Sequence, residues 1–118
     1  MNAPGIYNFT VYKGVTLRKT FVYKPGGVVA DLTGYAAVCN WRAGKVLDST
    51  SPLVSLTVGG GGVIMTPSDG KVEIYMPHTS TIALNLTAYY YFIHLIAPNT
   101  DVLPFLEGKI TMGITALP

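Results

Sequence analysis

Charged residues are scarce in this chain. They make up 12% of its 118 residues, against roughly 25% in a typical soluble domain. Eight Lys and Arg are set against six Asp and Glu, which gives a formal net charge of +2, and no run of basic residues occurs. Nucleic-acid binding normally needs a basic patch or stripe, so the sequence does not favour a nucleic-acid partner. Because 49% of the residues are hydrophobic, we expect a partly apolar surface that suits contact with other proteins.

The densest basic group is small and interrupted. It consists of Lys13, Arg18, Lys19 and Lys24. Side chains that alternate along a strand are spaced in this way, so we expect this group to form the solvated face of one strand.

Cysteine is nearly absent, since Cys39 is the only one. A disulfide within the chain and a metal cage of several cysteines are therefore excluded. Residues 1–5 show no basic region followed by an apolar stretch, so we expect no signal peptide and synthesis in a reducing cytoplasm. The longest apolar stretch, residues 88–97, is too short to span a bilayer and predicts no membrane partner.

Helical periodicity is also nearly absent, and β-favouring runs take its place. Gly, Pro, Asn and Asp interrupt these runs at intervals of about 8 to 12 residues, which is typical of a sandwich or barrel. The length suits one domain. The sequence therefore predicts an all-β protein, a single antiparallel β-sandwich over residues 1–118, with one short helical turn or crossover near residues 78–86.

The runs define the expected strands. They cover residues 6–12, 16–23, 35–42, 53–58, 62–66, 71–76, 88–97, 102–107 and 109–115. The first two are joined by a short turn, residues 62–66 and 71–76 form a hairpin, and Gly108 admits a bulge or bend in the last part. The four glycines at 59–62 lack the lysine and hydroxyl residue of a phosphate-binding loop, so we interpret them as a turn.

Two strands carry the clearest alternation. In residues 35–42 we expect Tyr35 and every second residue after it to face inward, with Trp41 as a core anchor and Cys39 as a small core side chain. Residues 88–97 are apolar on both faces. One face fits the core, and the other predicts a protein interface. That interface comprises Tyr90, Phe92, His94 and Ile96.

Groups able to perform catalysis are few, and most fall in predicted turns. His94 lies in the most hydrophobic strand, where a neutral, hydrogen-bonded imidazole is expected. No nucleophile elbow, zinc-binding helix or calcium loop occurs, so we predict no enzyme and no catalytic, cofactor-binding or metal-binding residue. Eight tyrosines leave carbohydrate binding as an alternative, with Tyr7, Tyr12 or Tyr23 exposed at one loop end.

One segment carries a resemblance. Asp31-Leu32-Thr33-Gly34-Tyr35, followed by the alternating residues 36–42, resembles a segment of small virion proteins of tailed bacteriophages that are related to the amino-terminal domain of the baseplate upper protein. Residues 13–18, 68–72, 89–91 and 106–111 follow the family pattern in the same order, so the resemblance spans residues 7–115. The chain lacks the family's arginine-bearing tail, and it lacks the Asp of a Tyr-x-Tyr-Asp pattern after Tyr91.

The resemblance implies an immunoglobulin-like β-sandwich without catalysis, built into the virion in several copies after assembly in the bacterial cytoplasm. It implies a tail or baseplate protein whose partners are other virion proteins. A capsid decoration protein bound to the major capsid protein is the alternative, and a host-glycan-binding module is a further one. In the shared segment, we expect Asp31 and Thr33 to bond within their own turn while Gly34 adopts a positive φ.

Overall fold

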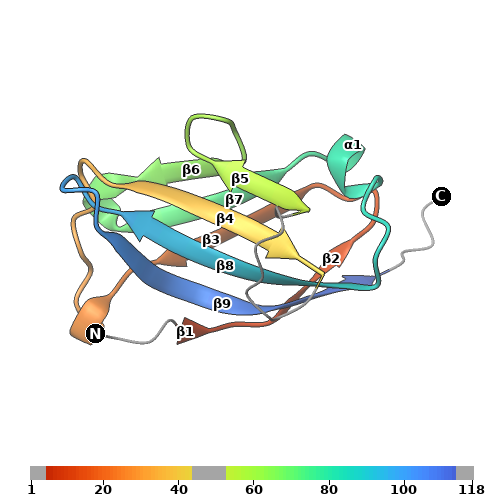
Figure 1. The fold of residues 1–118 in the computed structure, drawn as a ribbon, viewed down its shortest axis with the longest axis horizontal. Coiled ribbons are helices and arrows are strands. Elements are labelled where there is room, and N and C mark those ends of the chain that lie inside the picture. Colours follow the sequence, from red (N-terminus) through yellow and green to blue (C-terminus); the bar gives the residue numbers. More distant parts are fainter. Residues whose placement is uncertain (1–4, 44–52, 114–118) are drawn as a thin grey trace.

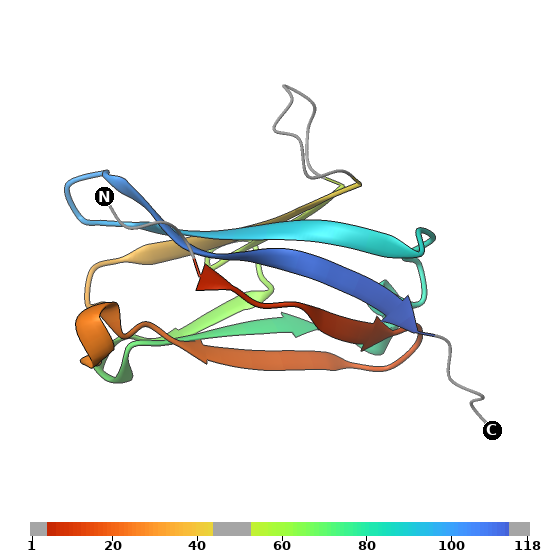
Figure 2. The same cartoon turned by 90° about the horizontal axis from the view of Figure 1, so that it is seen from below.

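The computed structural model describes residues 5–43 and 53–113, which form two β-sheets packed face to face (Figures 1 and 2). The larger sheet contains β1 (Gly5–Ile6), β2 (Phe9–Tyr12), β4 (Ala36–Arg42), β5 (Val54–Thr57), β8 (Ala88–Ile96) and β9 (Val102–Gly113). The smaller sheet contains β3 (Leu17–Val22), β6 (Val63–Thr66) and β7 (Lys71–Met76). The remaining regular elements of the described residues are two 3-10 turns, η1 (Pro25–Gly27) and η2 (Pro67–Asp69), and one helical turn, α1 (His78–Thr81).

The strand order confirms the predicted sandwich and its immunoglobulin-like arrangement. The larger sheet runs β1-β9-β8-β4-β5, with β2 also on β9, and the smaller sheet runs β3-β7-β6. Immunoglobulin domains place strands C, F and G in one sheet and B, E and D in the other, and β4, β8, β9 and β3, β7, β6 occupy these positions. The first strand differs, because β1 and β2 pair in parallel with β9 while every other described strand pair is antiparallel.

The core lies between the sheets and is built by the two alternating strands. Cys39 and Trp41 of β4 and Tyr91 and Ile93 of β8 are at most 1% exposed. The prediction that residues 37, 39 and 41 face inward is confirmed, and Tyr35 packs against the same core while partly exposed. Side chains from β3, β6 and β7 close the core from the smaller sheet.

A buried tyrosine fixes the chain where it enters β8. The Tyr89 hydroxyl accepts hydrogen bonds from the backbone N–H groups of Asn85 and Leu86, at 3.2 and 3.4 Å. Its ring lies 5.7 Å from the ring of Trp41. A tyrosine at this corner that bonds to upstream backbone is a hallmark of immunoglobulin-like sandwiches. Sequence analysis missed this role, since Tyr89 was identified only as one residue of an alternating strand.

Several predicted strands needed correction. Residues 6–12 form two strands, because the chain leaves β9 at Tyr7 and Asn8. β9 is continuous through Gly108, and the bulge predicted there lies instead at Phe105, between the pairs Ile93–Leu106 and His94–Pro104. Residues 114 and 115, predicted as strand, lie outside the described residues. No helix in the described residues is long and apolar enough to cross a membrane.

The hairpin of β6 and β7 is confirmed, and so is a short helical turn within residues 78–86. The turn comprises only four residues and ends before Ile82. No side chain caps its start. Buried Thr81 holds it in place, since its hydroxyl donates to the carbonyl oxygen of Val15 at 3.0 Å.

Candidate functional site

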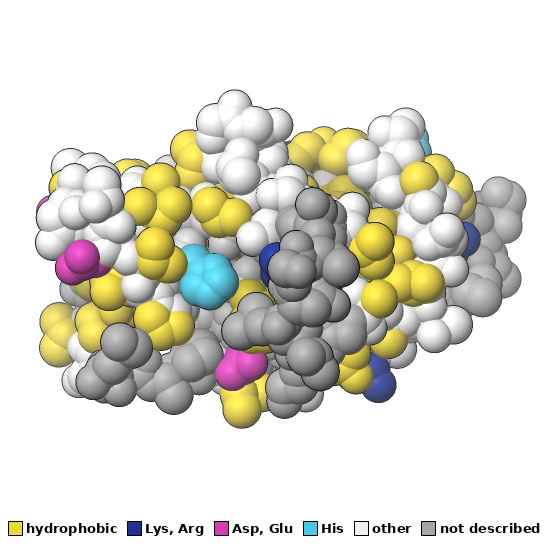
Figure 3. All heavy atoms as spheres, in the orientation of Figure 1, with side chains coloured by type: hydrophobic (Ala, Val, Ile, Leu, Met, Phe, Trp, Pro, Cys, Tyr) yellow, Lys and Arg dark blue, Asp and Glu magenta, His cyan; other side chains and the backbone are white. Residues whose placement is uncertain are grey.

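The outer face of the larger sheet carries the four side chains predicted as an interface. β8 alternates between buried and half-buried residues along its whole length, so Tyr90, Phe92, His94 and Ile96 all point away from the core. Figure 3 shows this side of the molecule, where hydrophobic side chains and a histidine gather with few charged groups among the described residues.

Neighbouring strands widen this apolar row. Ile96 is paired with Ala36, and His94 is paired with Val38. Both partners are half-buried on the same face. The charged side chains of this face gather at its Tyr90 end, where Tyr90 is paired with Arg42 of β4 and with Lys109 of β9. Glu107 of β9 lies opposite Phe92. We call this surface, defined by Tyr90, Phe92, His94, Ile96, Ala36 and Val38, the outer apolar row.

The outer face of the smaller sheet is different in character. Arg18 of β3 donates to the Glu73 carboxylate at 2.8 Å, and its guanidinium lies 4.5 Å from the centre of the Tyr75 ring. An exposed pair of this kind adds at most about 1 kcal/mol to stability and is solvated. The two outer faces therefore differ, and only the larger sheet presents a continuous apolar row.

His94 is neutral at pH 7. Burial lowers its pKa below the ordinary value, and the positive charge of Arg42 lowers the pKa further. Its ring stacks on Phe92 with 6.3 Å between ring centres and 4° between planes. A neutral imidazole in this position can contact an apolar partner and still form one donated and one accepted hydrogen bond.

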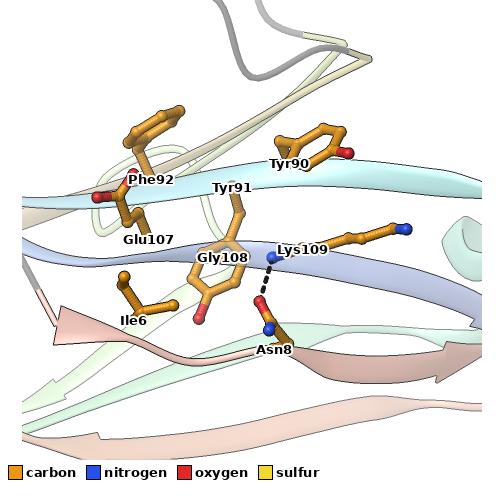
Figure 4. Close-up of a pocket in the computed structure, with 8 residues that line it drawn as sticks. All are labelled: Ile6, Asn8, Tyr90, Tyr91, Phe92, Glu107, Gly108 and Lys109. Atoms are coloured by element: carbon orange, nitrogen blue, oxygen red, sulfur yellow. Dashed lines mark hydrogen bonds between the residues drawn. The ribbon is translucent and has the colours of Figure 1, made fainter.

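A hollow of about 230 Å³ lies beside the outer apolar row, where the chain passes from β1 to β2. Figure 4 shows its lining, which comes from the three strands β1, β8 and β9 and from the β1–β2 break: Ile6, Asn8, Tyr90, Tyr91, Phe92, Glu107, Gly108 and Lys109. At this break, the Asn8 side-chain oxygen accepts the Lys109 backbone N–H at 2.8 Å, in place of a backbone carbonyl. The carbonyl of Tyr7 turns toward the core and accepts the Tyr91 hydroxyl at 2.5 Å.

Gly108 makes this break possible. A Cβ atom at Gly108 would lie 2.0 Å from the Tyr7 carbonyl oxygen, far inside van der Waals contact. Its φ is not in the positive range, so the requirement for glycine is one of space. Gly108 was predicted as a bend in its own strand, whereas its role is to admit the backbone of the neighbouring one.

The Asp31 turn was predicted correctly. The Asp31 carboxylate accepts from the Thr33 backbone N–H at 3.0 Å and from the Thr33 hydroxyl at 2.6 Å. These hydrogen bonds lower the pKa of the carboxyl group, and Gly34 follows with a φ of 86°. The segment is thus a scaffold that starts β4.

The potentially reactive groups in the core are held in unreactive states. Burial raises the pKa of the Cys39 thiol to about 12, although the Trp41 Nε1–H donates to Sγ at 3.3 Å. Burial also raises the pKa of the Tyr91 hydroxyl, which already donates to Tyr7. Within residues 5–43 and 53–113, no three His, Cys, Asp or Glu side chains cluster as metal ligands.

The three tyrosines proposed for glycan binding do not meet at one loop end. Tyr12 ends β2 just before β3, and Tyr23 follows the other end of β3. Tyr23 instead packs with its ring 5.3 Å from Phe105. Tyr7 lies between them and packs edge-on against Phe21. The chain matches no protein-family model and no curated protein sequence.

Proposed function

We propose that this chain is a non-catalytic structural protein of a tailed bacteriophage virion, present in several copies at the tail or baseplate, and that it acts by docking the outer apolar row onto another virion protein. The observation that carries the docking role is the apolar row itself. It is continuous along β8, half-buried in the single chain, and bordered by charged residues.

This arrangement matches the anatomy of protein interfaces. Their centres are depleted of charge and enriched in aromatic residues, and their rims are polar. Phe92 supplies aromatic area near the centre of the row, while Arg42, Glu107 and Lys109 lie toward its Tyr90 end on the adjoining strands. The low charge content of the whole chain supports the same role. The phage setting rests on the resemblance of residues 31–42 and the four segments aligned with them.

Copy number in purified particles tests the setting. Quantitative mass spectrometry of virions from the phage that encodes the chain should find it, in about three, six or twelve copies if it belongs to the tail or baseplate. Hundreds of copies would indicate capsid decoration instead and contradict the tail assignment. Absence from the particle would overturn the structural role altogether.

A pair of variants tests the docking surface. Ile96→Glu places a charge in the outer apolar row, where Ile96 is paired with Ala36 and Val102, while Ile64→Glu makes the same change on the outer face of the smaller sheet. Both variants are first compared with the wild type by circular dichroism and thermal unfolding. We expect Ile96→Glu to be lost from particles and Ile64→Glu to be retained. Equal incorporation of two folded variants would contradict docking through the outer apolar row.

A further inference from the structure

The edge of β3 is a second unpartnered element of the fold. Immunoglobulin sandwiches of the common type place strand A beside strand B in the smaller sheet. Here β1 and β2 lie on β9 instead, so β3 pairs only with β7 among the described strands. Figure 2 shows β3 at the margin of the smaller sheet, on the side where β1 and β2 lie in the larger sheet.

The hydrogen-bonding groups that face this edge follow from the register. The Tyr23 backbone N–H donates to the Gly70 carbonyl at 2.8 Å, and the register continues with Val22 opposite Lys71. Because the direction of backbone groups alternates along a strand, Arg18, Thr20 and Val22 direct their N–H and C=O groups away from β7. These backbone groups can therefore form hydrogen bonds with one added strand.

The side chain of Lys19 decides which strand can be added. We expected Lys19 on a solvated face, but it projects inward, with its ammonium 5.3 Å from the centre of the Tyr7 ring and 5.6 Å from that of Phe9. No carboxylate of the described residues lies within 4.0 Å of it. An inward lysine on an edge strand is a known barrier to apolar strand pairing. It also disfavours pairing of the β3 edge with β3 of a second copy of the chain, because this would bring two Lys19 side chains to the same edge.

Two hollows lie along β3. One of about 140 Å³ lies between β2 and the start of β3, and Leu17 and Lys19 are part of its lining. The other, of about 280 Å³, lies between the end of β3 and β9, beside Val22 and Phe105. Strands rise about 3.3 Å per residue, so inward side chains at positions i and i+4 of an added strand are about 13 Å apart, as Leu17 and Phe21 are along β3. Position i+2 then lies beside Lys19.

We propose that the β3 edge binds an extended segment of a partner protein with the pattern apolar-x-acidic-x-apolar, in which the acidic side chain pairs with Lys19. Charge favours this occupant beyond Lys19 itself, because Lys13 and Lys24 lie beside the two ends of β3. Lys19 thus rejects apolar strands and selects acidic ones, which gives specificity through both repulsion and attraction. This surface is separate from the outer apolar row and does not depend on the proposed virion role.

The test uses the full chain and two capped peptides, Thr-Val-Thr-Asp-Thr-Val-Thr and the same sequence with Asn for Asp. Amide NMR shifts locate binding and give affinities. We expect the acidic peptide to shift the amides of Arg18, Thr20 and Val22, and to bind about fivefold more tightly at low salt, the upper range for a partly exposed ion pair. The preference should weaken as salt is added.

Two variants separate the parts of the proposal. Lys19→Gln should make the two peptides equal in affinity. Thr20→Pro removes an N–H that faces away from β7, so it should abolish binding while the fold remains. Ser55→Pro on the β5 edge of the larger sheet is the matched control and should bind as the wild type does. Absence of shifts on β3 at about 1 mM peptide, or an acidic preference that survives in Lys19→Gln, would overturn the proposal.

Discussion

Replacing Gly108 with alanine tests how the first strand is held on the larger sheet. The added methyl group would lie 2.0 Å from the Tyr7 carbonyl oxygen, so one of the two backbones must move. β9 is paired with β8 from Val102 to Thr111, whereas β1 is a two-residue strand whose Ile6 is 73% exposed. We therefore expect the Tyr7–Asn8 break and β1 to leave β9, while the rest of the sandwich stays folded.

The magnitude follows from the hydrogen bonds lost with this movement. They are Tyr7 N–H to Glu107 C=O at 3.0 Å, Lys109 N–H to the Asn8 side chain at 2.8 Å, and the Tyr91 hydroxyl to Tyr7 C=O. Each contributes about 1 kcal/mol net, so Gly108→Ala should lower the free energy of unfolding by about 2 to 3 kcal/mol. For a domain of this size, this corresponds to a Tm decrease of roughly 10 °C.

Urea denaturation followed by Trp41 fluorescence measures this change, and hydrogen exchange of the Tyr7 and Lys109 amides shows whether β1 has left. Gly59→Ala is the matched control, because a Cβ atom there meets no other atom within 4 Å and the φ of Gly59 is not positive. The control should be neutral or slightly stabilising. A Gly108→Ala protein within about 0.5 kcal/mol of the wild type would refute the packing argument, since that is the range of ordinary surface substitutions.

Three further predictions concern single side chains. Thr100 has a φ of 73°, so Thr100→Gly should relieve strain and raise the free energy of unfolding by about 0.5 to 1 kcal/mol in urea titrations; a decrease would contradict this. The Cys39 thiol, fully buried and with its pKa raised to about 12, should resist iodoacetamide at pH 8 unless the chain is unfolded; rapid native labelling would refute it. The pKa of His94 is lowered in the fold, so the unfolded chain binds the proton first as pH falls below about 6.5. The contribution of His94 to stability should therefore be constant above that pH and fall below it, and His94→Gln should remove this part of the decline; an unchanged pH profile in the variant would contradict it.

The central strands could be predicted from the sequence because the alternation of buried and outward side chains is visible within each strand. β4 and β8 each alternate with period two, and a buried strand shows this pattern whatever its partners are. Trp41 was therefore identified as a core residue, and the second face of β8 as an apolar row outside the core. The Asp31 turn was equally readable, because its hydrogen bonds connect residues only two apart.

Features that depend on distant residues were not predictable in this way. The kink at Tyr7 involves Tyr91 and Lys109, far away in the sequence, and no local pattern marks it. Lys19 belongs to a sequence that looks like an ordinary amphipathic edge strand, so its inward direction became visible only once Tyr7 and Phe9 were placed beside it. Parallel pairing of the first strand with the last is likewise a property of topology.

A single feature of that topology explains both the hollow and the open edge. Residues 5–12 pair with β9 in one parallel register that is interrupted at Tyr7 and Asn8, and Gly108 provides the space for this interruption. Among the described strands, the same pairing leaves β3 without a neighbour on its outer side. An inward lysine on β3 then has a clear physical reason, since an unprotected edge of this kind would pair with other copies of the chain. The position of the first strand thus determines which surfaces the sandwich offers, and Lys19 limits what can bind to the one that it exposes.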